Sequence, residues 1–89
     1  MKLINIINPT VNIGDLAVIC RPDDVILLRQ DAVYLCSRSD IIWPTAQVYA
    51  LDSDIAIRQL TIQPGITALS AERWLQLTID AQQVLLWQN

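Results

Sequence analysis

The stretch that decides the fold is Asp24-Val-Ile-Leu-Leu-Arg29, in which four consecutive apolar residues stand between charged ones. Such a run is typical of a parallel strand, because helices cover both faces of a parallel sheet. Similar short runs occur at residues 2–8, 47–51, 66–69 and 84–87. Helices are predicted between them, ending near residues 21, 39, 60 and 81. This alternation predicts a single α/β domain over residues 1–89, with a mostly parallel sheet and flanking helices.

Polar residues near the starts of these helices are the expected N-caps, since their side-chain oxygens accept hydrogen bonds from unpaired backbone N–H groups. The second helix is predicted over residues 32–39. The candidate caps, in chain order, are Asn12 or Asp15, then Asp31, then Asp52 or Ser53, and finally Ser70.

The composition indicates that part of the apolar surface is shared with another chain. Of the 89 residues, 53% are hydrophobic and only 17% are charged, whereas ordinary globular domains carry about 25% charged residues. Large exposed apolar patches are unusual on monomers. We therefore expect an oligomer.

Other features exclude several classes of protein. No apolar run approaches the roughly 20 residues of a membrane span, and the apolar start, closed by Asn8-Pro9, does not resemble a secretory signal. A cytoplasmic location with reduced thiols is therefore expected. The net charge is −3 and the basic residues are scattered, so direct nucleic-acid binding by this chain is not expected.

The residue types leave few routes to catalysis. The chain has no histidine and only two glycines, which excludes Cys–His and Ser–His dyads, most catalytic zinc sites, and glycine-rich phosphate or dinucleotide loops. We expect no enzyme activity, no metal and no cofactor. The remaining chemical candidates are the thiols of Cys20 and Cys36.

Four segments carry a resemblance to a known family. Leu3-Ile-Asn-Ile-Ile-Asn-Pro9 is similar to its first strand and turn, and Asp24-Val-Ile-Leu-Leu-Arg-Gln-Asp-Ala-Val33 to its "D-x-L-L-L-x-Q-D-G-V" segment. Val48-Tyr-Ala-Leu-Asp-Ser-Asp54 with Arg58 and Leu60-Thr61 is similar to "V-Y-A-L-x-x-D…A-R-G-L-T". Trp74-Leu-Gln-Leu-Thr78, followed by Trp87, looks like its "F-V-x-L-T" helix and terminal tryptophan. In this order the segments resemble the TusB/DsrH family of the DsrE-like superfamily, with Ala32 and Gln59 in place of family glycines.

The resemblance implies a DsrE/TusB-like fold and a non-catalytic subunit of a TusBCD-like sulfur-relay complex. TusC-like and TusD-like partners, or their DsrF and DsrE equivalents, would join it in a dimer of heterotrimers. The complex would receive persulfide sulfur from a donor protein and pass it to an acceptor protein for 2-thiolation of the tRNA wobble uridine. The family's essential carrier cysteine lies on the TusD-like subunit.

Two alternatives stay open at this point. The chain could be a DsrH-like persulfide carrier in sulfur oxidation that uses Cys20, or a homo-oligomeric α/β protein without a sulfur-transfer role. The sequence does not distinguish tRNA thiolation from sulfur oxidation.

The two thiols have competing interpretations. Cys20 is either a sulfur carrier or a small apolar residue that packs the first helix. It stands near the C-terminal end of that helix, and Asp23 and Asp24 follow, so the helix dipole and both carboxylates disfavour a thiolate. Cys36 is interpreted as a small core residue.

Other candidates are polar or aromatic. Gln30 and Asp31 follow the second strand, at the end of the sheet where open α/β folds bind ligands, so they are either a candidate pocket or only a helix cap. The candidate interface residues are Trp87, Trp74 and Trp43, because tryptophan is enriched where subunits meet, although it also occurs in partly buried cores.

Overall fold

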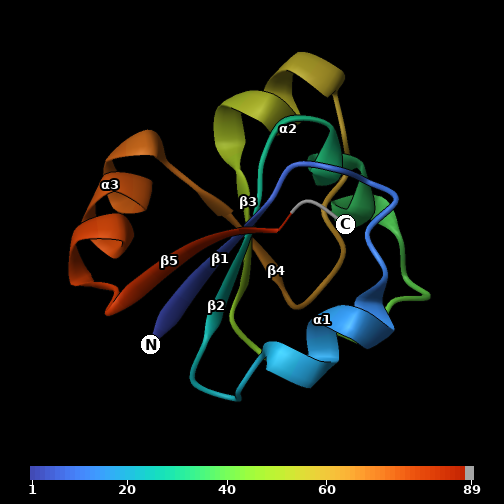
Figure 1. Ribbon diagram of the computed structural model, residues 1–89. Coiled ribbons are helices and arrows are strands. Elements are labelled where there is room, and N and C mark those ends of the chain that lie inside the picture. Colours follow the sequence, from blue (N-terminus) through green and yellow to red (C-terminus); the bar gives the residue numbers. More distant parts are fainter. Residues whose placement is uncertain (88–89) are drawn as a thin grey trace.

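All the strands lie in one parallel sheet (Figure 1). The computed structural model describes residues 1–87 of the 89. The sheet order is β4-β3-β2-β1-β5, with β1 (Lys2–Ile6), β2 (Val25–Leu28), β3 (Val48–Leu51), β4 (Ile66–Leu69) and β5 (Gln83–Trp87). The predicted α/β fold with a parallel sheet is confirmed, and the fully buried β2 takes its central place.

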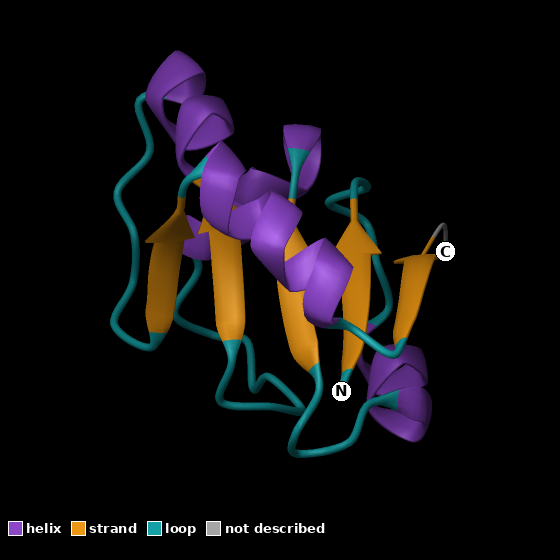
Figure 2. Ribbon diagram, turned by 90° about the vertical axis from the view of Figure 1, so that its left-hand side faces the viewer, coloured by secondary structure: helices purple, strands orange, loops and turns teal. Residues whose placement is uncertain are grey.

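The helices are divided unequally between the two faces. They are α1 (Ile13–Ile19), the 3-10 helix η1 (Gln30–Ser37), α2 (Asp52–Arg58) and α3 (Ala71–Asp80). The helix α3 carries the chain from the β4 edge to the β5 edge, and it lies alone diagonally across one face (Figure 2). Within residues 1–87, no helix has the length and apolar character to cross a membrane.

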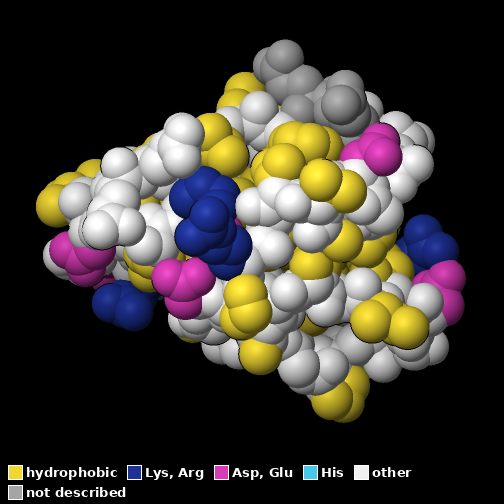
Figure 3. All heavy atoms as spheres, turned by 60° about the horizontal axis from the view of Figure 1, so that its bottom comes forward, with side chains coloured by type: hydrophobic (Ala, Val, Ile, Leu, Met, Phe, Trp, Pro, Cys, Tyr) yellow, Lys and Arg dark blue, Asp and Glu magenta, His cyan; other side chains and the backbone are white. Residues whose placement is uncertain are grey.

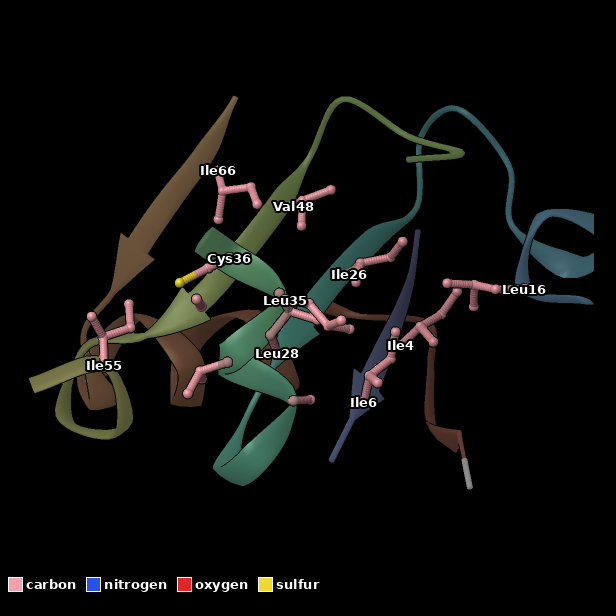
Figure 4. Packing of buried hydrophobic residues seen from close by; sticks show 13 residues of the cluster. Ile4, Ile6, Leu16, Ile26, Leu28, Leu35, Cys36, Val48, Ile55 and Ile66 are labelled. Atoms are coloured by element: carbon pink, nitrogen blue, oxygen red, sulfur yellow. The ribbon is translucent and has the colours of Figure 1, made fainter. Parts of the chain in front are cut away.

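The larger part of the core lies on the face opposite α3. Side chains that alternate along the strands, such as Ile4 and Ile6 of β1, point into it together with Leu16 of α1 and Leu35 of η1 (Figure 4). All four are no more than 3% exposed. This face is therefore closed by apolar packing from several elements.

The α3 face has a smaller core. Leu3, Val25, Leu27 and Leu69 are buried there beneath Leu77 of α3, and Trp74 packs against them. One amphipathic helix cannot cover five strands. The carboxyl-terminal parts of β1 and β5 are left beside α3 rather than beneath it (Figure 2).

Two predicted helix caps are confirmed. The Oδ1 atom of Asn12 accepts a hydrogen bond of 3.1 Å from the backbone N–H of Asp15. The Oγ atom of Ser70 accepts one of 3.1 Å from the N–H of Arg73. The first helix ends at Ile19, however, two residues before the predicted end.

The other predicted caps are wrong. Arg29 and Leu51 precede the second and third helices, and neither provides a side-chain cap. The second helix is a 3-10 helix that begins at Gln30, two residues before the predicted start, so Asp31 lies inside its first turn. Asp52 and Ser53 likewise lie inside α2. The Asp52 carboxylate is still stabilising there, because it lies near the positive end of the helix dipole.

Two glutamines adopt left-handed backbone conformations. Gln59 ends α2 with φ 53°, and Gln30 begins η1 with φ 52°. A residue with a Cβ is disfavoured in this region, where glycine is the usual choice. The family glycine at the position of Gln59 would therefore suit this left-handed conformation. Ala32, in contrast, is buried within η1 and does not have positive φ.

Candidate functional site

The structure places the candidate residues at opposite ends of the strands. Cys20 directly follows α1, which returns the chain to the amino-terminal edge before β2 begins. Gln30 and Asp31 follow the carboxyl end of β2. The candidate sulfur carrier and the candidate pocket therefore do not form one site.

The surroundings of Cys20 disfavour its thiolate. The residue is partly buried, and its Sγ lies 3.6 Å from the carbonyl oxygen of Arg21. Burial raises the pKa of the thiol, and the negative charges of Asp24 and Asp23 raise it further, against an opposing effect of Lys2. A thiol in such surroundings is a weaker nucleophile at neutral pH than one beside a cation or a helix N-terminus.

The Asp24 carboxylate is a structural centre of this edge. It accepts hydrogen bonds from the backbone N–H groups of Lys2, at 2.8 Å, and Arg21, at 2.9 Å, and it pairs with the Lys2 ammonium at 2.6 Å. Burial alone would raise its pKa, but the side-chain and backbone hydrogen bonds from Lys2, with that from Arg21, lower the pKa to about 2. Asp24 therefore stays ionised beside Cys20 at neutral pH.

Cys36 lies in the core between η1 and β3 (Figure 4). Its exposed fraction is 0%. Burial raises the pKa of its thiol, and the nearby Ser37 hydroxyl, 4.0 Å from the sulfur, only partly opposes this effect. The position fits the predicted core role.

Gln30 and Asp31 belong to a network of ion pairs and hydrogen bonds at the carboxyl edge. The backbone N–H of Gln30 donates to Asp54 Oδ2 at 2.8 Å. Arg58 pairs with Asp31 at 2.9 Å and with Asp54 at 3.5 Å, and its guanidinium carbon lies 5.7 Å from the ring centre of Tyr34. The network holds the left-handed turn at Gln30. The carboxylates of Asp31 and Asp54 are already paired with Arg58.

The three tryptophans are all partly buried. Trp43 and Trp87 pack against the core on the α1 and η1 face, whereas Trp74 packs on the α3 face. Within residues 1–87, the Trp87 Nε1 atom is buried without a hydrogen-bond partner. Whether any of them contacts another subunit stays a prediction.

A model of the DsrH-like protein family matches residues 9–84. The chain belongs to this family. The match agrees with the resemblance to TusB and DsrH proteins and suggests a sulfur-relay subunit. Among curated proteins, none matches the chain.

One polar group of this DsrH-like chain, on the α3 face, was not predicted from its sequence. The Nε–H of Arg29 donates to Asn5 Oδ1 at 3.1 Å, and the Asn5 Nδ2–H donates to the Leu85 carbonyl at 3.3 Å. The Arg29 guanidinium lies over Trp74, with 4.6 Å between its carbon and the ring centre. The available signal was Asn5 itself, a polar residue within an apolar strand.

Proposed function

We propose that this DsrH-like chain is a non-catalytic subunit of a TusBCD-like sulfur-relay complex that supports 2-thiolation of the tRNA wobble uridine. In this role it holds a sister subunit, which carries the persulfide, in a competent assembly. Sulfur-donor and acceptor proteins act on the complex, and this chain makes no direct contact with tRNA. The family match supports the relay role.

The state of the two thiols is the observation that carries the non-catalytic assignment. A persulfide carrier must attack a donor sulfur as a thiolate. Cys36 is fully buried, and the Cys20 thiol has a raised pKa beside two carboxylates. Neither thiol has the electropositive surroundings of a reactive cysteine, so the transferred sulfur travels on another subunit.

Exposed apolar side chains support the assembly role. Val18 is 84% exposed and Ile42 is 89% exposed. Hydrophobic groups stand among polar atoms on the face seen when the bottom of Figure 1 is turned forward (Figure 3). Subunit contacts would remove such groups from water.

Deletion and complementation test the proposal. Deleting the gene in its native host should abolish wobble 2-thiouridine, measured by mass spectrometry of tRNA nucleosides. Wild-type protein and its Cys20→Ser variant should both restore the modification, since no sulfur passes through Cys20. Unchanged 2-thiouridine on deletion would refute the tRNA role, and failure of Cys20→Ser alone would refute the non-catalytic one.

The partial exposure of Cys20 favours a second candidate function, a DsrH-like persulfide carrier in sulfur oxidation. The purified protein would be incubated with a cysteine desulfurase, cysteine and a relay protein, then analysed by intact-mass spectrometry. A gain of one sulfur atom that disappears in Cys20→Ser would establish Cys20 as a persulfide carrier, whichever pathway it serves.

A further inference from the structure

The groove between α3 and β5 is a feature that the proposed function leaves unused. It has a volume of about 270 Å³. Asn5 and Arg29 form its polar part. The other lining residues are Trp74, Thr78, Val84, Leu85 and Leu86. Its lining comes from α3, from the edge strand β5 and, through Asn5, from the carboxyl-terminal half of β1.

The Arg29 side chain is held rigidly in this groove. Asn5, which is 5% exposed, fixes the guanidinium Nε, and the Trp74 ring supports its flat face. Asn5 is in turn fixed by the carbonyl of Leu85. A guanidinium held in this way loses little conformational entropy when it binds another group.

The charge of Arg29 is not neutralised within residues 1–87. The described ion pairs involve Lys2, Arg38 and Arg58, and none involves Arg29. Its only hydrogen bond from the side chain within that range is the one from Nε. Both terminal nitrogens are therefore available to donate, and their paired geometry matches the two oxygens of a carboxylate.

Apolar groups surround this cation. Val84 and Leu86 of the edge strand β5 are 46% and 48% exposed, and Leu75 of α3 is 62% exposed. A second hollow, lined by Ala71, Trp74, Leu75 and Thr78, adjoins the groove through its shared residues. A small anion would leave this apolar surface in water, whereas a protein partner would cover it. Arginine and tryptophan are also the residues that most often dominate the binding energy of protein interfaces.

We propose that the α3–β5 groove docks a sister relay subunit that presents a carboxylate side chain surrounded by apolar ones. The carboxylate accepts two hydrogen bonds from the Arg29 terminal nitrogens, and apolar side chains of the partner cover Val84 and Leu86. The identity of the partner rests on the proposed function above. The location and chemistry of the contact rest on the groove itself.

Binding measurements with point variants test this docking site. The protein would be titrated by calorimetry with purified TusC-like and TusD-like subunits from the same organism. Arg29→Glu and Leu86→Asp should each weaken binding by about tenfold or more, as expected for residues at the centre of an interface. Leu86 is half exposed on an edge strand, so its replacement keeps the test valid if Arg29→Glu unfolds.

Matched variants away from the groove serve as controls. Arg21→Glu changes an exposed arginine near the amino-terminal ends of the strands, and Ser53→Asp changes an exposed polar residue of α2. Both should bind within about twofold of wild type, because surface changes outside an interface have small effects. Thermal unfolding would confirm that each variant is folded.

The outcomes separate the two proposals. If wild type binds and the two groove variants bind equally well, the docking site is wrong and the relay role stands. If wild type does not bind the sister subunits, both proposals fail. If the groove variants instead abolish self-association and leave sister binding intact, the groove belongs to a second copy of this chain, and the docking proposal is overturned.

Discussion

The ammonium nitrogen of Lys2 lies 2.6 Å from a carboxylate oxygen of Asp24, which joins the amino-terminal ends of β1 and β2. Only 3% of the Asp24 side chain is exposed. We expect Asp24→Asn to lower the free energy of unfolding at pH 7 by about 2 kcal/mol, the value implied by a pKa lowered from 3.8 to about 2. Urea unfolding followed by circular dichroism measures this difference.

The difference should depend on pH in a defined direction. The folded-state pKa of Asp24 lies below its unfolded value, so the stabilisation is fully present above pH 3.8 and is lost as pH falls toward 2. Wild type and Asp24→Asn should therefore become nearly equal in stability at about pH 2. Asp23→Asn, at an exposed carboxyl with no ion pair within residues 1–87, should match wild type throughout. A gap that persists in acid would contradict the assignment.

Gln59→Gly should stabilise the protein by about 0.5–1 kcal/mol, because glycine adopts the left-handed C-terminal position of α2 without steric cost. The observed φ of 53° is the reason. Ala56→Gly, three residues earlier inside the same helix, should instead cost about 1 kcal/mol. Thermal and urea unfolding of both variants check the contrast, and a loss of stability in Gln59→Gly would rule out strain at this turn.

The strands and their parallel arrangement were predictable from sequence, because buried parallel strands appear as unbroken apolar runs between turn residues. The cap at Ser70 was predictable for a similar local reason. The 3-10 helix at Gln30 was not, since its start depends on Asp54, which lies 24 residues away and accepts the Gln30 N–H. Local propensity carries no information about such a contact.

The candidate site was predictable only in part. The position of Cys20 after a helix and before two aspartates correctly indicated surroundings that disfavour a thiolate. The contact of Arg29 with Trp74 joins residues that are 45 positions apart, and it arises because α3 crosses the sheet to reach β5. A sequence shows the apolar face of a helix but not which cation it will meet.

The two thiols should differ sharply in alkylation by iodoacetamide. Cys20, which is partly exposed, should react in the folded protein, and Cys36 should react only after unfolding. Because the Asp23 carboxylate helps to raise the pKa of Cys20, Asp23→Asn should shift the pH–rate profile of alkylation to lower pH. Peptide mass spectrometry assigns each adduct. Equal labelling of both thiols in the native protein would show that the core around Cys36 opens readily.

The contact between Arg29 and Trp74 should be measurable as a coupling energy. Arg29→Met removes the charge, and Trp74→Leu removes the aromatic face while keeping an apolar side chain in the α3 core. The free energy lost in the double variant should be about 0.5–1 kcal/mol smaller than the sum of the two single losses, as expected for a partly exposed cation–π pair. Trp74→Phe keeps an aromatic ring under the guanidinium and should retain most of the coupling. Additive losses would mean that Arg29 is not held by the ring and that the groove is less preorganised than the structure indicates.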